Sequence, residues 1–245
     1  MMPRSVDRFV DSLGGLLLPP RCVLCGGPGQ RPCLDLCGDC EASLPDSPAW
    51  HLPARPEAKV PDLPRIDRCY ARYTYGFPVD HLVHSLKYRG QLATGRVLGA
   101  LLADGVKALG LHLDVDWLLP VPLHPGRHAE RGFNQAAEIA RWTGRALRRP
   151  VMLAGLSRTR DTRPQVGLGP AERHANIQGA FRATARVRGC RIVVVDDVIT
   201  TGSTVAAAAA TVREAGAATV DVWCIARADA IERVHWQPRM EMDKA

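Results

Sequence analysis

No apolar run in this chain is long enough to cross a membrane. The longest mainly apolar run, residues 205–212, falls far short of the ~18 residues that a membrane-spanning helix needs. The run from Leu13 to Leu18 contains two glycines and is followed by two prolines, with no small-residue cleavage site after it, so it does not fit a secretory signal. We therefore expect a cytoplasmic protein without a membrane span, whose cysteines are reduced and form no structural disulfides.

Internal repeats and an extreme composition are also missing. Hydrophobic residues make up 46% of the 245 residues, charged residues make up 23%, and the mean hydropathy is −0.10, which argues against a disordered or fibrous protein. The charge is unevenly distributed, because residues 123–191 contain fourteen arginines, no lysine and only four acidic residues. Such a segment indicates an anionic partner, a phosphate-rich metabolite or a nucleic acid; the alternative is arginines on solvated surfaces.

Strand and helix patterns alternate along the second part of the chain. We expect strands at residues 69–75, 115–121, 191–195 and 219–226, and helices at residues 80–88, 91–111, 134–147 and 204–215. This alternation predicts an α/β fold, a parallel sheet with helices on both faces. The residues between 121 and 132 and between 157 and 180 are expected to form loops.

The first sixty residues lack this alternation of strands and helices. An amphipathic helix is expected at residues 5–18, and residues 45–63 contain five prolines without periodicity, which is typical of a linker. We therefore expect an N-terminal helix, metal module and linker in residues 1–60. A large domain follows in residues 61–236, and a short tail in residues 237–245.

Two cysteine pairs mark the expected metal module. Cys22-x2-Cys25 and Cys37-x2-Cys40 are separated by eleven residues, a spacing that suits a tetrahedral structural zinc (Zn2+) site with four thiolate ligands. Metal binding would supply folding free energy that so short a segment lacks. The alternative is four free thiols, and Cys33 is a further candidate ligand.

An acidic pair followed by a hydroxyl-rich loop is the most informative motif. An apolar strand ends in Asp196 and Asp197, and a helix begins after the residues Thr200, Thr201, Gly202, Ser203 and Thr204. Ligands of open α/β sheets bind at the carboxyl ends of strands, and helix N-termini bind phosphate through backbone N–H groups. Carboxylates repel phosphate but accept hydrogen bonds from vicinal hydroxyls. The motif therefore predicts a ribose 5-phosphate site; a paired-acid magnesium site would not explain the loop.

Residues 193–204 resemble the ribosyl-phosphate motif of the type I phosphoribosyltransferases. The resemblance implies that Asp196 and Asp197 hold the ribose 2- and 3-hydroxyls of phosphoribosyl pyrophosphate (PRPP). It implies that residues 200–204 cradle the 5-phosphate and that Mg2+ accompanies the substrate.

The rest of the chain is similar to one family with this fold, the ComF (competence protein F-like) family. The matching segments are the cysteine pairs, LKYRG at residues 86–90, PVPLH at 120–124 continuing to RGFNQ at 131–135, and RTRDTRPQ at 158–165 with Arg173, Asn176 and Phe181. The resemblance covers about residues 5–226. It implies a type I phosphoribosyltransferase domain preceded by a four-cysteine, zinc-ribbon-like module, and a role in competence, DNA uptake or the use of external DNA.

The resemblance also implies roles for residues outside the acidic motif. Pyrophosphate is expected to contact Leu123, His124 and Arg131, and Arg158 and Arg160 are expected to close over the transition state, where negative charge develops. Arg127 is expected on the solvated surface, and Asn134 and Gln135 are alternatively helix caps. A hood within residues 65–95 would bind an acceptor base, using some of Tyr73, Tyr75, Phe77, Lys87 and Tyr88.

Two functions remain open at this point. One is a phosphoribosyltransferase that uses PRPP and an unidentified acceptor. The other is a non-catalytic accessory protein that keeps the fold and binds single-stranded DNA through arginines and exposed aromatic residues. Either function would serve the DNA-uptake machinery.

Overall fold

The computed structural model describes residues 20–29, 35–45, 51–53, 65–159 and 179–228. The expected helix at residues 5–18, Cys33, Arg160, most of the expected linker and the C-terminal tail lie outside these residues. Among the described helices, the longest apolar stretch is too short to span a bilayer.

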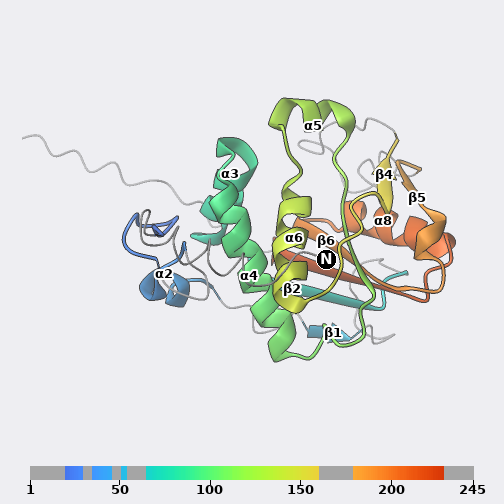
Figure 1. The fold of residues 1–245 in the computed structure, drawn as a ribbon, viewed down its shortest axis with the longest axis horizontal. Coiled ribbons are helices and arrows are strands. Elements are labelled where there is room, and N and C mark those ends of the chain that lie inside the picture. Colours follow the sequence, from blue (N-terminus) through green and yellow to red (C-terminus); the bar gives the residue numbers. More distant parts are fainter. Residues whose placement is uncertain (1–19, 30–34, 46–50, 54–64, 160–178, 229–245) are drawn as a thin grey trace, which may run out of the picture.

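A five-stranded sheet forms the centre of the molecule (Figure 1). Its order is β1–β2–β7–β6–β3, in which β1 pairs antiparallel with β2 and all other neighbours are parallel. The strands are β1 (His51–Pro53), β2 (Arg68–Thr74), β3 (Trp117–Pro120), β6 (Arg191–Ile199) and β7 (Thr219–Arg227). The sheet confirms the predicted parallel α/β architecture, with β1 added at one edge from within the expected linker.

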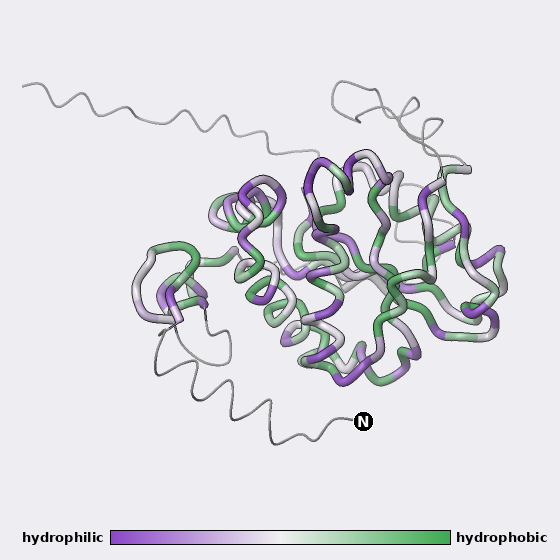
Figure 2. Tube along the Cα trace, turned by 45° about the horizontal axis from the view of Figure 1, so that its top comes forward, coloured by the Kyte–Doolittle hydropathy of each residue, from purple (hydrophilic) through white to green (hydrophobic). Residues whose placement is uncertain are grey.

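Helices cover both faces of this sheet. One face carries α4 (Leu92–Ala108) and α6 (Gln135–Leu147), with α3 (Val79–Arg89) packed against α4, and the opposite face carries α8 (Ser203–Glu214). Successive side chains of β6 point to opposite faces of the sheet. Val193 and Val195 pack in the core under α4 and α6, whereas Ile192 and Val194 pack in the core under α8. A central parallel strand is therefore apolar on both sides. Figure 2 shows hydrophobic colouring along the central strands.

Two segments expected as loops contain regular structure. Pro125–Arg131 forms the short helix α5, and Leu156–Arg158 (β4) pairs antiparallel with Phe181–Ala183 (β5). Sequence periodicity misses α5 because none of its residues is buried. It begins with proline at its first position and ends at Gly132 with φ 76°, which favours a helix start and a left-handed C-cap.

The N-terminal cysteine segment packs against the large domain. It contains α2 (Gly38–Ala42), and Leu36 and Leu44 are buried in the same core cluster as residues of α3 and α4. The Asp35 carboxylate, also buried, accepts a hydrogen bond from the Arg96 Nε atom of α4 at 2.9 Å. The segment is thus anchored by apolar contacts and an ion pair, although so short a segment was expected to depend on metal binding for its folding free energy.

Candidate functional site

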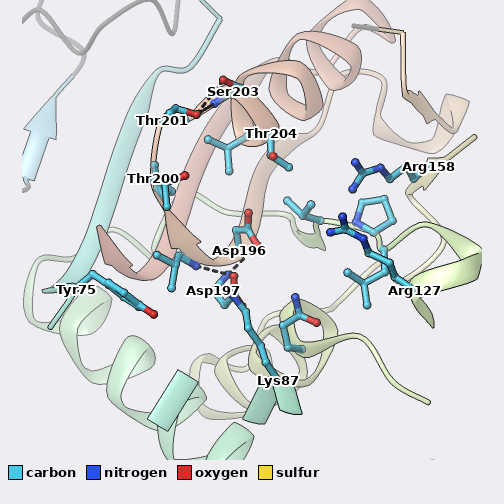
Figure 3. Close-up of a pocket in the computed structure, with 18 of the residues that line it drawn as sticks. Tyr75, Lys87, Arg127, Arg158, Asp196, Asp197, Thr200, Thr201, Ser203 and Thr204 are labelled. Atoms are coloured by element: carbon cyan, nitrogen blue, oxygen red, sulfur yellow. Dashed lines mark hydrogen bonds and ion pairs between the residues drawn. The ribbon is translucent and has the colours of Figure 1, made fainter. Parts of the chain in front are cut away.

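A cavity of about 340 Å³ opens where β3 and β6 end and α8 begins (Figure 3). Polar and charged side chains from five segments line it: Lys87, Arg127, Arg131, Gln135, Arg158, Asp196, Asp197, Thr200, Thr201, Ser203 and Thr204. Their convergence follows from the topology, because parallel strands present their carboxyl ends at one edge of the sheet.

The acidic pair lies at the floor of this cavity, at the end of β6. Asp196 Oδ1 accepts the backbone N–H of Asp197 at 2.9 Å, and Asp197 Oδ1 accepts the N–H of Val198 at 2.7 Å. Asp197 is only 4% exposed, and its Oδ2 lies 2.7 Å from Nζ of Lys87 on α3. The two carboxyls therefore have different surroundings, and only Asp197 has a cationic partner in direct contact among the described residues.

Burial and neighbouring charges shift the pKa values of Asp196 and Lys87 in this cavity. Burial raises the pKa of Asp196, and the neighbouring Asp197 carboxylate raises it further, to about 8. Burial alone would lower the pKa of Lys87, but the Asp197 and Asp196 carboxylates outweigh it and raise the pKa above its usual value. At neutral pH, Asp196 is therefore mainly a neutral hydrogen-bond donor, while Lys87 is charged.

The loop after β6 presents hydrogen-bond donors to the cavity. Gly202, with φ 78°, precedes α8 and offers no side chain to cap its first N–H groups. The Thr201 Oγ1 and Ser203 Oγ atoms lie 3.0 Å apart at the helix start. Left-handed φ values suit glycine, and the N-terminus of a twelve-residue helix attracts anions. This end of the cavity is suited to a phosphate.

Arginines form the opposite wall of the cavity. Arg131, the last residue of α5, places its guanidinium 5.2 Å from the Tyr88 ring centroid, and Arg158 on β4 places its own 5.6 Å from the Phe181 ring centroid. Arg127 also lines the cavity and extends into it (Figure 3). Arg127, which was expected on the solvated surface, is partly buried on α5 and is one of the residues that line the cavity.

The expected pyrophosphate residues divide into two groups. Leu123 lines the cavity. The imidazole of His124 instead caps α5, where Nδ1 accepts the backbone N–H of Gly126 at 3.2 Å. Asn134 caps α6 through Oδ1, which accepts the N–H groups of Ala136 and Ala137; the capping alternative is thus confirmed for this residue.

Three aromatic residues of the expected hood differ in exposure. Tyr75 and Tyr88 line the cavity and are 41% and 64% exposed, whereas Tyr73 is buried in the core. The partner of Asp197, Lys87, was expected only as a hood residue. The ion pair joins positions 110 residues apart, and neither spacing nor periodicity carries a signal for such a contact.

The four cysteines of the N-terminal segment form a second cluster. The Sγ atoms of Cys22, Cys25, Cys37 and Cys40 all lie within 4.8 Å of one another, and those of Cys25 and Cys37 are 3.7 Å apart. Tetrahedral zinc with Zn–S bonds of about 2.3 Å separates its sulfur ligands by about 3.8 Å. Burial raises the pKa of Cys22, but backbone hydrogen bonds from neighbouring residues outweigh it and lower the pKa to about 6, whereas desolvation and the neighbouring thiols raise the pKa of Cys40. This donor set fits a metal that prefers thiolates.

Known proteins resemble the chain at two levels. The phosphoribosyl transferase domain family matches residues 130–241. The DNA utilization protein YhgH of Salmonella typhimurium is 36% identical over 214 residues, covering 84% of this chain and 83% of that protein. Competence protein F of Haemophilus influenzae is 30% identical over 216 residues and covers 85% of both chains.

One similar solved structure is the glutamine PRPP amidotransferase from B. subtilis, complexed with ADP and GMP. It is 26% identical with a TM-score of 0.38, and the match covers 53% of this chain and 25% of that chain. Together with the family match, the observed sheet and the cysteine cluster confirm the expected fold class, a phosphoribosyltransferase-type α/β domain preceded by a four-cysteine module.

Proposed function

Because the chain belongs to the ComF family, we propose that it binds PRPP in the cavity at the end of β6 and serves the uptake or use of DNA. The observation that carries the proposal is one cavity in which an acidic pair, a helix N-terminus and three arginines face one another. PRPP requires this combination, because it joins a ribose diol to a phosphate at one end and a pyrophosphate at the other.

Each end of the ligand has a matching part of the cavity. The 5-phosphate is assigned to residues 200–204 and the first N–H groups of α8, where the helix dipole favours negative charge. The diol is assigned to Asp196 and Asp197, whose oxygens accept hydrogen bonds from hydroxyls. Asp196 can also donate a hydrogen bond at neutral pH, since its pKa is raised to about 8.

The pyrophosphate is assigned to the segment that runs from β3 into α5. Leu123 and Arg131 line the cavity there, and the backbone of His124 follows Leu123 at the start of α5. If the protein is a transferase, the bond between the ribose C1 and the pyrophosphate oxygen breaks, an acceptor nucleophile bonds to C1, and pyrophosphate departs with the electron pair. Arg131, Arg158 and Arg160 would then stabilise the charge that grows on the departing group. Mg2+ is expected to arrive with PRPP.

The cysteine cluster is assigned a structural zinc ion. Four thiolates with no space reserved for substrate are typical of structural rather than catalytic zinc sites. When bound, the ion would cross-link residues 22–40 and preserve the surface that packs on α3 and α4.

PRPP binding is tested by calorimetric titration with Mg2+. The wild-type protein is expected to bind PRPP, and Asp197→Ala is expected to weaken binding at least about tenfold, because hydrogen bonds to charged groups contribute about 1.5–3 kcal/mol. Absence of wild-type binding at millimolar PRPP would overturn the proposal. Release of pyrophosphate in the presence of candidate acceptors would identify a transferase.

A non-catalytic DNA-binding protein is the second candidate function. The relatives named for DNA utilization support it, as does the exposed Tyr88, whose ring centroid lies 5.2 Å from the guanidinium of Arg131 at the end of α5. Single-stranded DNA should then bind with an affinity that falls as salt rises, and the double variant D196A/D197A should bind DNA as the wild type does. Loss of DNA binding in that variant, or no binding by the wild type at low salt, would contradict this candidate.

A further inference from the structure

Lys87 reaches the acidic pair from a different layer of the molecule. It lies on α3, and its side chain is only 22% exposed, whereas its neighbour Tyr88 is 64% exposed. Lysines usually keep the ammonium group in water, and burial of an unpaired charge is costly. The cost is offset here by the contact of 2.7 Å between Nζ and Asp197 Oδ2.

The contact determines how Asp197 is oriented. One carboxylate oxygen accepts the backbone N–H of Val198 at 2.7 Å, and the other contacts Lys87. With both oxygens engaged, the carboxylate cannot rotate freely, and only its remaining lone pairs are available to a ligand. Asp196 is less buried, and its described contact is the backbone N–H of Asp197.

We propose that Lys87 is a positioning residue of the ribose subsite, which fixes the Asp197 carboxylate for the diol and affects the ligand only through Asp197. The proposal rests on the proposed function, in which the acidic pair holds the ribose hydroxyls. It also links α3, and therefore the expected hood, to occupancy of the diol site, because any displacement of α3 must stretch or break the ion pair.

The positions of the charged groups argue against an anion-binding role for Lys87. Figure 3 shows Lys87 approaching Asp197 from α3, below the acidic pair, whereas Arg127 and Arg158 lie to the right of the pair. The Nζ atom is committed to a buried carboxylate, so removal of Lys87 should change recognition of the hydroxyls and leave recognition of the phosphates intact.

The test measures the affinities of ribose 5-phosphate, 2-deoxyribose 5-phosphate and inorganic pyrophosphate by calorimetry. The variants are K87M, K87R, D197N and the double variant K87M/D197N. K107M is the control, because Lys107 forms an exposed ion pair with Asp104 on α4. We expect K87M to weaken ribose 5-phosphate binding about tenfold, as expected for loss of a well-placed charged acceptor. Pyrophosphate binding should stay unchanged, and the preference for ribose over deoxyribose should largely disappear.

Two further results define the outcome. K87R should restore most of the affinity, and K87M should have no further effect in the D197N background, because two residues that act through one contact are not additive. K87M can fail to fold because it leaves Asp197 buried and unpaired. The double variant K87M/D197N carries neither charge, so its comparison with D197N still tests whether Lys87 acts only through Asp197.

Weaker pyrophosphate binding by K87M, an added effect in the D197N background, or wild-type affinities in K87M would each overturn the proposal. If the wild-type protein binds neither PRPP nor ribose 5-phosphate, the proposed function fails and this inference fails with it. Wild-type binding with unchanged Lys87 variants removes this inference alone.

Discussion

At the scale of single residues, the two neighbouring carboxyls of β6 have unequal chemistry. Asp197 pairs with Lys87, whereas Asp196 lies partly buried beside the Asp197 carboxylate and has a pKa raised to about 8. The groups that face the pair are Lys87 on α3, Tyr75 after β2, and the cavity arginines. A neutral acid beside a carboxylate can both donate to and accept from a diol, which two carboxylates could not do.

The raised pKa of Asp196 predicts a stability that depends on pH. In the unfolded chain this carboxyl ionises near 3.8, whereas in the folded protein it keeps its proton up to about pH 8. Between these values the folded state binds more protons, so wild-type stability falls as the pH rises. Asp196→Asn cannot ionise, so its stability relative to the wild type should rise steadily between pH 4 and pH 8, by at most about 1.4 kcal/mol per pH unit.

Urea unfolding of both proteins from pH 4 to pH 8.5 measures this difference. Asp104→Asn, at an exposed position of α4, controls for exchanging a carboxylate for an amide. A stability difference between Asp196→Asn and the wild type that does not change with pH would contradict the prediction.

At the scale of elements, α4 packs closely against α6, and α3, which carries Lys87, packs against α4. Gly99 of α4 lies against α6, and the Thr143 hydroxyl donates a hydrogen bond to its carbonyl at 3.1 Å. A side chain at Gly99 would place its Cβ atom 2.5 Å from Cβ of Trp142 and 2.9 Å from the Ile139 carbonyl oxygen. The two helices can approach this closely only because this position has no side chain.

Gly99→Ala is therefore expected to destabilise the protein. Alanine favours a helix over glycine, but the clash with backbone atoms of α6 should outweigh that gain and leave a net loss of about 1–3 kcal/mol. Chemical unfolding measures the loss. Gly76→Ala is the control, because a Cβ atom there meets nothing within 4 Å; equal stabilities of the two variants would argue against close packing as the cause.

At the scale of the whole molecule, the cysteine segment and the large domain form one packed unit. Leu36 is fully buried in the core cluster that contains residues of α3 and α4, and Asp35 pairs with Arg96. Figure 1 shows α2 beside the α3–α4 layer and on the opposite side of the molecule from α8, at whose start the cavity lies. A metal at the cysteines would thus stabilise the domain from outside its binding site.

Cys40→Ser should release the metal and lower stability. We expect about one equivalent of zinc in the wild type and much less in the variant, with a loss of about 1–2 kcal/mol, or roughly 2–8 °C in the unfolding midpoint. Elemental analysis and thermal unfolding give the two readouts. Cys190→Ser, a thiol outside the cluster, should keep both values, and a zinc-free wild type would contradict the assignment.

Sequence alone was sufficient for features that depend on neighbouring residues. Apolar periodicity placed the four parallel strands β2, β3, β6 and β7 and the long helices, because a segment that packs against a core must repeat its apolar positions. The order of strand, acidic pair, hydroxyl-rich loop and helix indicated the cavity around Asp196, and the cysteine spacing indicated the cluster around Cys22. These signals are local, since the chain itself brings the residues together.

Only the tertiary structure decided the contacts between distant segments. It paired Lys87 with Asp197, turned Arg127 into the cavity, used the ring of His124 as a helix cap and packed Leu36 against the domain. Short α5 buries none of its residues and therefore has no apolar pattern to detect. The physical reason is common to all of them: partners far apart in sequence meet through the packing of whole elements, which no spacing along the chain records.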